Sequence, residues 1–526
     1  MHISGKKLLA PLAGALLCSA LSAAPAQAID YKISGVWVVG FEHSNVYPRG
    51  FDKADSFAAE QRFRTQLTAV ASEALSGTVQ FEIGRTDWGK AANGGALGAD
   101  GKIVQVRFAY LDWMVPQTDV KVRMGLQLLK LPGVLSKYGF GPIFGKEMAG
   151  VSVSSPLFKG DSVQSDLTFF WARPYNDNSD EEYTSVAKSK TQWLDNMDCF
   201  ALMLPFRGDG WKIEPYAMYS LIGKYSLTGV SAAMGDSGII APRGGLTPVL
   251  GHAGKASWGN FGYANGFGNL DPKARGFQFN ELHKLDRDWG NGFWAGLVGQ
   301  FDLTSALRLG VEGAFGSVYM GEIKNYSGFG DKGRTMQMKR QGWYAGARLD
   351  YKADWGVPGL IAWYGSGDDD NPYNGSERLP QFNTPWAVSS LGFGDPGFDE
   401  QTWKLLGHNP GGTAGIIAQI DKISFIPDLT HLLRAGVYFG TNSCKMPKRA
   451  GMNWPNRADG PMGYLTTTDN AWEVNLVNTY KIYENLTFQL EAAYVRLNLD
   501  SDTWQGRQDA IYRDNYRVSC MFKYSF

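Results

Sequence analysis

The sequence predicts an all-β protein, a transmembrane antiparallel β-barrel of about 18 strands. Three observations support this prediction. Stretches of alternating polarity recur along the chain, short and long connections alternate between them, and the last strand ends in aromatic residues. Aromatic residues make up 13% of the chain, and 65 of its 526 residues are glycine. After the N-terminal segment, no stretch approaches the roughly 18 apolar residues of a spanning helix, so spanning strands are favoured over spanning helices.

The alternation has a period of two residues, which is typical of strands with one polar and one apolar face. In 57–69, for example, Phe57, Phe63 and Leu67 share one face, while Arg62 and Arg64 share the other. The weakest strand is 148–156, and sixteen strands are the alternative if it and one other strand fail. The predicted strands are 31–42, 56–71, 77–85, 102–115, 120–130, 148–156, 163–172, 196–206, 211–222, 290–302, 305–318, 340–353, 357–365, 414–426, 431–441, 470–482, 485–498 and 511–526.

The connections between these strands alternate between two lengths. Short turns such as 116–119 and 483–484 follow one end of the strands, and long connections follow the other. Short periplasmic turns opposite long external loops are typical of bacterial membrane barrels, in which an even strand number places both termini on one side. Loops of such length are uncommon in compact soluble domains. The long connections are 43–55, 86–101, 173–195, 223–289, 366–413 and 442–469.

The N-terminus reads as a secretory signal peptide. Lys6 and Lys7 precede an apolar stretch, 8–24, and Ala26 and Ala28 give the small-residue pattern of a cleavage site. We therefore expect a signal peptide over residues 1–28 and one barrel domain over 29–526.

The last strand is the most specific signal of destination. Tyr516, Val518, Phe522, Tyr524 and Phe526 alternate with polar residues, and the chain ends on the phenylalanine. A final strand ending in Phe is similar to the signal by which outer-membrane barrels are recognised for assembly, so Phe526 is the predicted assembly signal. With the leader, it predicts the outer membrane of a Gram-negative bacterium.

The mature chain resembles the outer-membrane homotrimeric porins of the Desulfovibrio type, within the general bacterial porins. The likeness is carried by the start at 29–35, the segment 60–66 and the Phe-terminated last strand. It implies a homotrimer of pores for passive diffusion of small hydrophilic solutes and ions. It also implies outer-membrane lipids, lipopolysaccharide and the barrel-assembly machinery as partners.

General porins narrow their channel with a third external loop that folds inward between strands five and six. The corresponding segment is 131–147, rich in the glycine and proline that sharp turns favour. General porins usually place acids on this loop, whereas here Glu147 is the one acid, beside Lys137 and Lys146. This composition argues against cation preference.

Five cations are expected to line one sector of the pore. Arg62 and Arg64 of strand two share a lumen-facing parity with Lys121 and Arg123 of strand five, and Arg107 of strand four is expected to join them. Such a cluster would concentrate anions in the channel. One interpretation is that these residues only make the lumen polar, as any porin requires. The other is that they give the pore a preference for anions.

The same sequence leaves two other function classes open. A channel specific for an anion or a small sugar would be favoured by lumen aromatics, for which Tyr216, Trp294, Tyr344 and Tyr438 have the right parity. A structural or adhesive surface barrel is the third alternative, given the long loop 223–289.

Several chemistries are not predicted. With 51 basic and 51 acidic residues, two of the former in the leader, the chain lacks the basic excess of a nucleic-acid binder. No catalytic triad, zinc-binding or phosphate-binding motif is present, so neither an enzyme nor a cofactor is expected. Two acidic segments, 176–182 and 368–371, leave calcium open as a ligand of external loops.

Overall fold

The computed structural model describes most of the barrel. The described residues are 29–46, 57–91, 94–98, 104–176, 196–223, 285–326, 333–382, 384, 386–394, 405–407, 409–449, 464–506 and 513–526. The predicted signal peptide, 1–28, and nearly all of the predicted loop 223–289 lie outside them.

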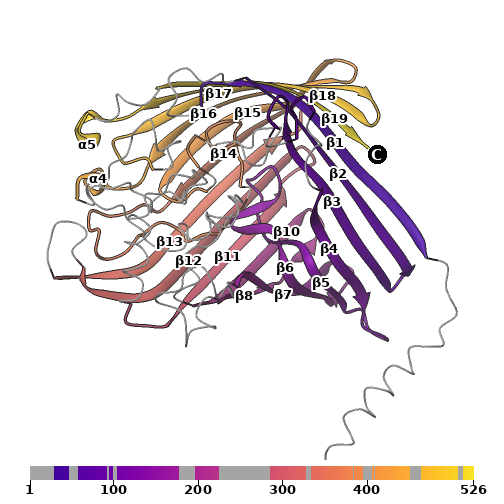
Figure 1. Cartoon of the computed structure of the whole chain (residues 1–526), viewed down its shortest axis with the longest axis horizontal. Coiled ribbons are helices and arrows are strands. Elements are labelled where there is room, and N and C mark those ends of the chain that lie inside the picture. The colour runs from indigo at the N-terminus through magenta and orange to yellow at the C-terminus, as the bar shows by residue number, and fades with distance from the viewer. Residues whose placement is uncertain are drawn as a thin grey trace, which may run out of the picture.

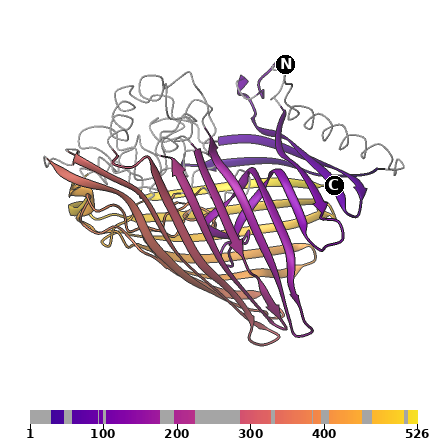
Figure 2. The ribbon, with the colours of Figure 1, turned by 90° about the horizontal axis from the view of Figure 1, so that it is seen from below.

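The described residues form one antiparallel sheet that winds around on itself (Figures 1 and 2). Nineteen strands occupy eighteen positions, because β8 and the short β9 both lie between β7 and β10. The strands are β1 (Asp30–Ser44), β2 (Phe57–Ser72), β3 (Leu75–Asp87), β4 (Val104–Met114), β5 (Lys121–Pro132), β6 (Phe140–Lys159), β7 (Val163–Asn176), β8 (Asn196–Met203), β9 (Phe206–Gly208), β10 (Trp211–Gly223), β11 (Trp289–Asp302), β12 (Leu307–Tyr326), β13 (Arg334–Tyr351), β14 (Val357–Gly365), β15 (Thr413–Ile426), β16 (Leu429–Gly440), β17 (Asn470–Tyr483), β18 (Leu486–Asn498) and β19 (Asp514–Ser525). Two short helices, α4 (Met446–Arg449) and α5 (Ser501–Trp504), accompany them.

The sheet closes where the first strand meets the last. Trp37 of β1 lies opposite Phe63 of β2 on one side and opposite Tyr524 of β19 on the other. A closed sheet has no free edge, which is the condition for a strand protein to cross a lipid bilayer. The predicted barrel of eighteen strands is confirmed and the sixteen-strand alternative is wrong, since the weakest predicted strand, 148–156, is part of a long β6.

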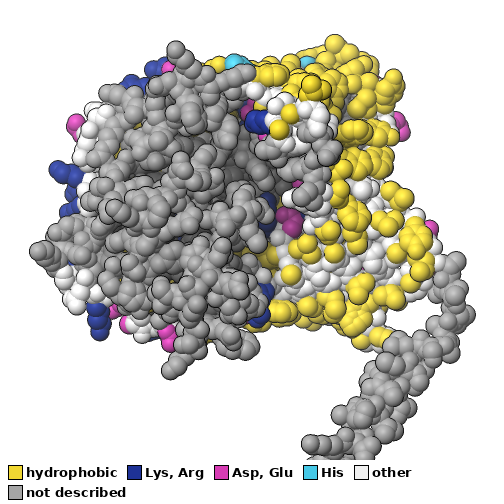
Figure 3. Space-filling view, viewed as in Figure 1, with side chains coloured by type: hydrophobic (Ala, Val, Ile, Leu, Met, Phe, Trp, Pro, Cys, Tyr) yellow, Lys and Arg dark blue, Asp and Glu magenta, His cyan; other side chains and the backbone are white. Residues whose placement is uncertain are grey.

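Most of the wall strands carry exposed apolar side chains that alternate with buried or polar ones. On β17, Trp472, Val474 and Leu476 are exposed, whereas the alternating Glu473 and Asn475 are buried. Hydrophobic side chains cover the part of the surface where Figure 1 places β1, β2, β18 and β19 (Figure 3). This inverted distribution, apolar outside and polar inside, suits a barrel whose outer face contacts lipid.

Glycine on the wall makes room for aromatic side chains of the lumen. A Cβ at Gly415 would lie 2.3 Å from the Trp363 ring, and one at Gly296 would lie 2.3 Å from the Tyr216 ring. Each glycine lies directly opposite the aromatic residue on the neighbouring strand, so the ring occupies the space that a side chain would need. The glycine enrichment of the sequence therefore has a structural cause in part of the wall.

The C-terminal residue completes the seam between β1 and β19. The Phe526 backbone N–H donates to Gly35 O at 3.1 Å, and Gly35 N–H donates to Phe526 O at 2.8 Å. The Phe526 ring crosses Gly35 and stacks on Phe63, with ring centroids 6.0 Å apart. The residue predicted as an assembly signal is thus also part of the closed barrel.

We expect Gly35→Ala to destabilise the seam, because the new Cβ would lie 2.4 Å from the Phe526 ring and 2.6 Å from the Arg64 carbonyl oxygen. Overpacking of this kind costs about 1–3 kcal/mol. The measurement is the thermal unfolding midpoint in detergent, with Gly313→Ala as the matched control, where the nearest atom is 3.4 Å away. Equal midpoints for the two variants would contradict the expectation.

Candidate functional site

The top of the β5–β6 hairpin leaves the barrel wall. The last residue of β5 paired with β4 is Leu126, and the first residue of β6 paired with β7 is Gly150. Between them β5 and β6 pair only with each other. We call this segment, 127–149, the inward hairpin; its turn spans 133–139.

The tip of the inward hairpin reaches β12. The backbone N–H groups of Val134 and Leu135 donate to one carboxylate oxygen of Glu312, the second at 3.2 Å. The other Glu312 oxygen accepts the Tyr344 hydroxyl of β13 at 2.6 Å. Val134 packs over Gly310, where a Cβ would lie 2.8 Å from it. The predicted inward-folded third loop is therefore confirmed, although strands occupy most of the predicted range 131–147.

A second segment also enters the lumen. The connection from β14 to β15, 366–412, was predicted as part of an external loop, 366–413, and it does join the external ends of these strands. It then turns inward, and we call 379–394 the inner loop. The Trp386 ring packs edge-on against Trp363 at 5.5 Å, and Phe393 against Tyr438 at 5.1 Å. Buried side chains of the inner loop include Leu379, Phe382, Trp386, Val388, Leu391 and Phe393.

The two inward segments are hydrogen-bonded to each other. Phe382 N–H donates to Ile143 O at 2.8 Å, and Lys137 N–H donates to Ala387 O at 3.1 Å. Ala387 N–H in turn donates to Ser136 Oγ at 3.2 Å. The inward hairpin and the inner loop therefore form one continuous structure inside the barrel, which we call the partition.

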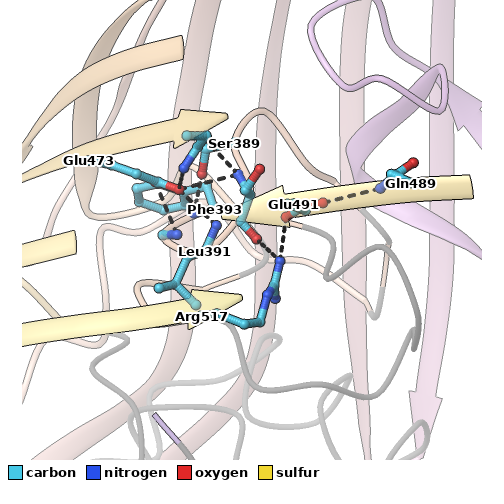
Figure 4. Close-up of polar contacts among 10 residues, drawn as sticks. Ser389, Leu391, Phe393, Glu473, Gln489, Glu491 and Arg517 are labelled. Carbon is cyan, nitrogen blue, oxygen red and sulfur yellow. Dashed lines mark hydrogen bonds and ion pairs between the residues drawn. The ribbon is translucent and has the colours of Figure 1, made fainter. Parts of the chain in front are cut away.

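The far end of the inner loop is held by a buried carboxylate of β17 (Figure 4). Glu473 accepts the three consecutive N–H groups of 390–392 at 3.2, 2.7 and 3.0 Å. It also accepts the Tyr438 hydroxyl at 2.7 Å and the Asn475 amide at 2.6 Å. Five donors on one carboxylate satisfy a group that would otherwise be costly to bury.

A buried arginine of β19 adds a second contact to the same end of the inner loop. Arg517 Nη2 donates to Ser390 O at 2.9 Å and to Glu491 at 2.6 Å, and the other Glu491 oxygen accepts from Gln489 at 3.3 Å (Figure 4). The partition is thus anchored to β12 at one end and to β17 and β19 at the other.

The two carboxylate anchors share one design that the sequence analysis missed. In each, a wall glutamate accepts consecutive loop N–H groups and the hydroxyl of a tyrosine on the neighbouring strand: Glu312 with Tyr344, and Glu473 with Tyr438. The alternation of polarity along β12 and β17 indicates that both glutamates face the lumen. The same alternation does not indicate which loops Glu312 and Glu473 bind.

The four lumen aromatics considered for sugar guidance do face inward, but the partition covers part of them. Tyr216, Trp294, Tyr344 and Tyr438 are all buried. Trp294 Nε1 donates to Pro380 O of the connection at 2.9 Å. These four residues support the inner structure and do not form an open aromatic track.

The predicted basic sector contains acidic partners on the same strands. Arg64 forms an ion pair with Glu82, which lies directly opposite on β3. Asp112 of β4 accepts two hydrogen bonds of 2.6 Å from Arg123 and lies 3.3 Å from the Lys121 ammonium. Glu147 is the one acid of the predicted loop 131–147, and the strands themselves add Glu82 and Asp112 as acidic partners of the predicted basic sector.

The remaining predicted residues lie on or against the inward hairpin. Arg107 of β4 forms an ion pair with Glu147, which links the hairpin to the wall. Lys137 lies in the turn, exposed, with its ammonium 4.8 Å from the Tyr138 ring. Lys146 lies on β6, opposite Leu129.

Arg62 differs from the other cations of this sector. It lies on the same face of β2 as Glu60 and Arg64, opposite Val38 of β1. Its Nε atom is buried and has no hydrogen-bond partner, and Arg62 forms no ion pair with any residue that the structure describes. Among the five predicted cations, Arg62 is the one without an acidic partner in the described residues.

The acidic segment 368–371, which the structure describes, does not present a metal site. Asp370 forms ion pairs with Arg449 and Lys445, and Asp369 accepts the Asn371 N–H at 2.7 Å. The described parts of the chain contain no group of three or more His, Cys, Asp or Glu side chains placed to hold a metal ion. Of 176–182, all but Asn176 lies outside the described residues.

The architecture defines the class of the protein. A closed antiparallel barrel with an even number of strand positions, an apolar outer face and a polar lumen is an outer-membrane β-barrel of the Gram-negative type. In the described ranges, no helix is both long and apolar enough to span a membrane.

Comparison with known proteins finds similar solved structures. OccK11 (OpdR) of Pseudomonas aeruginosa is 12% identical, with 94% of this chain and 96% of that chain covered at a TM-score of 0.45. OprD of the same organism is 12% identical, with 94% and 95% covered at 0.44. OccAB3 of Acinetobacter baumannii is 9% identical, with 94% and 99% covered at 0.47. No family model and no curated protein matches the chain.

Proposed function

We propose that this chain is an outer-membrane porin for passive diffusion of small hydrophilic solutes and ions. The observation that carries the proposal is the partition, which narrows the lumen of a closed barrel and is anchored to its wall by Glu312 and Glu473. Charged side chains of β2 to β5, including Arg64, Glu82 and Arg123, give this part of the lumen the polarity that hydrated solutes need.

Single-channel recording in planar bilayers tests the proposal directly. The purified protein is expected to insert in discrete current steps in KCl. A barrel that inserts, as shown by resistance to unfolding in detergent, yet passes no current would favour the alternative of a structural or adhesive surface protein. Saturable transport of one solute class would favour a substrate-specific channel.

We further propose anion preference, carried mainly by Arg62. The other cations of its sector have acidic partners at short range, so their fields largely cancel, while Arg62 has none among the described residues. A single uncompensated charge in a narrow channel raises the local concentration of counter-ions.

Arg62→Ala is expected to lower the chloride-to-potassium permeability ratio about twofold. The measurement is the reversal potential under a KCl gradient. Arg308→Ala is the matched control, because Arg308 forms an exposed ion pair with Asp302 near a turn. Cation selectivity in the wild type, unchanged by Arg62→Ala, would exclude the proposed role of this residue.

The partners implied by the resemblance remain proposals: a homotrimer, outer-membrane lipids and lipopolysaccharide around it, and assembly machinery that reads Phe526. The exposed apolar outer face supports the lipid contact. Cross-linking in native membranes is the direct test of the trimer.

A further inference from the structure

The external end of the inner loop is closed by a buried acidic residue. Asp368, three residues beyond β14, accepts the Ser376 hydroxyl at 2.5 Å and the Glu377 N–H at 3.2 Å. Its other oxygen accepts the Tyr464 hydroxyl at 3.0 Å. These bonds fold 368–377 into a compact turn, which we call the clasp, directly before the inner loop.

The clasp joins three parts of the external mouth. Asp368 N–H donates to the Asn442 side chain at 3.0 Å, and Ser443 N–H donates to Asp368 O at 2.7 Å, so the β16–β17 connection is held to it. Ser376 N–H donates to Lys339 O of β13 at 2.9 Å. Opening the clasp would therefore weaken the contacts among β13, the β14–β15 connection and the β16–β17 connection.

Three carboxyl groups meet at the clasp. Glu377 Oε2 accepts the Asp369 N–H at 3.0 Å, which places it beside Asp368 and Asp369. Partial burial, with the negative charges of Asp368 and Asp369 beside it, raises the pKa of the Glu377 carboxyl to about 7. The protonated form of Glu377 is therefore the one that the closed clasp favours.

Four basic residues lie around the clasp, and the contacts described for them are with residues other than Glu377. Arg340 of β13 donates to Arg378 O, and Arg378 donates to Gly411 O while its guanidinium lies over the Tyr464 ring. The cations near α4, Lys445 and Arg449, pair with Asp370. In the described part of the chain, Glu377 lies beside the acids Asp368 and Asp369 and near the Tyr464 hydroxyl, and its ionisation adds a third negative charge next to the two acids.

We propose that the clasp is a pH-sensitive gate, in which protonated Glu377 holds the external mouth closed and ionised Glu377 loosens it. This inference rests on the proposed function and names a regulation of the same channel. Its direction follows from linkage: the closed form binds the proton more tightly than the open form. Closure is therefore complete in acid and is lost as the pH rises through about 7.

The open fraction of single channels, measured between pH 5.5 and 8.5, tests the proposal. For the wild type we expect it to be about tenfold higher at the upper pH. Glu377→Gln keeps an acceptor for the Asp369 N–H but cannot ionise. The open fraction of its channels should therefore stay low at every pH. Glu484→Gln, in an exposed turn between β17 and β18, is the control and should keep the wild-type dependence.

A second variant protects the test against misfolding of the first. Asp369→Asn removes one neighbouring negative charge, so the midpoint of the pH response should move to lower pH. A wild-type open fraction that does not change with pH, or an unchanged midpoint in Asp369→Asn, would overturn the gate while leaving the porin proposal intact. Absence of any current in the wild type would instead refute the porin proposal itself.

Discussion

Replacing 380–393 by a short Gly-Ser linker is expected to raise single-channel conductance about two- to threefold. This part of the inner loop carries Trp386, Leu391 and Phe393, which are almost completely buried inside the barrel. Removing them would leave space that water and ions can occupy. The measurement is the mean current step in planar bilayers at fixed KCl concentration.

The matched control for this deletion keeps the chain length. A Gly-Ser segment as long as the original loop removes the side chains but not the backbone, so it should give an intermediate and noisier conductance. A deletion variant that unfolds in detergent like the wild type, yet shows the same current step, would mean that ions do not pass the inner loop.

Glu473→Ala is expected to detach the far end of the inner loop. It leaves the N–H groups of Leu391 and Gly392, the Tyr438 hydroxyl and the Asn475 amide without this acceptor, while Ser390 N–H keeps Asn475 Oδ1 at 3.2 Å. Each buried unsatisfied donor costs about 1–3 kcal/mol. Water that enters to satisfy these donors would separate the loop from β17. We expect a lower unfolding temperature and frequent, larger current fluctuations.

Two comparisons make the Glu473 result specific. Glu473→Gln keeps one acceptor oxygen and should be intermediate, and acetate added at high concentration should quieten the Glu473→Ala channel by occupying the vacated carboxylate position. Wild-type currents in Glu473→Ala, with no response to acetate, would show that Arg517 and the inward hairpin hold the loop without Glu473.

The acidic partners in the basic sector are predictable from strand register. Arg64 and Glu82 lie opposite each other across a tight connection between β2 and β3, and Asp112 and Arg123 lie opposite each other across the next short turn. Tight connections restrict strand register, so both acidic partners were within reach of the sequence. Arg107 was different, because its partner Glu147 lies on the hairpin that leaves the wall.

The sequence by itself determined the barrel and the parity of its faces and favoured eighteen strands over sixteen, because alternation and connection length are local properties of the chain. The lumen-facing parity of Arg62 and Arg64 followed from the same alternation. Only the tertiary structure decided how the lumen is filled. The Glu312 anchor joins residues 178 positions apart in the sequence, and the Glu473 anchor joins residues more than 80 apart. Contacts of this range depend on closure of the whole sheet, which brings distant strands to opposite sides of one lumen.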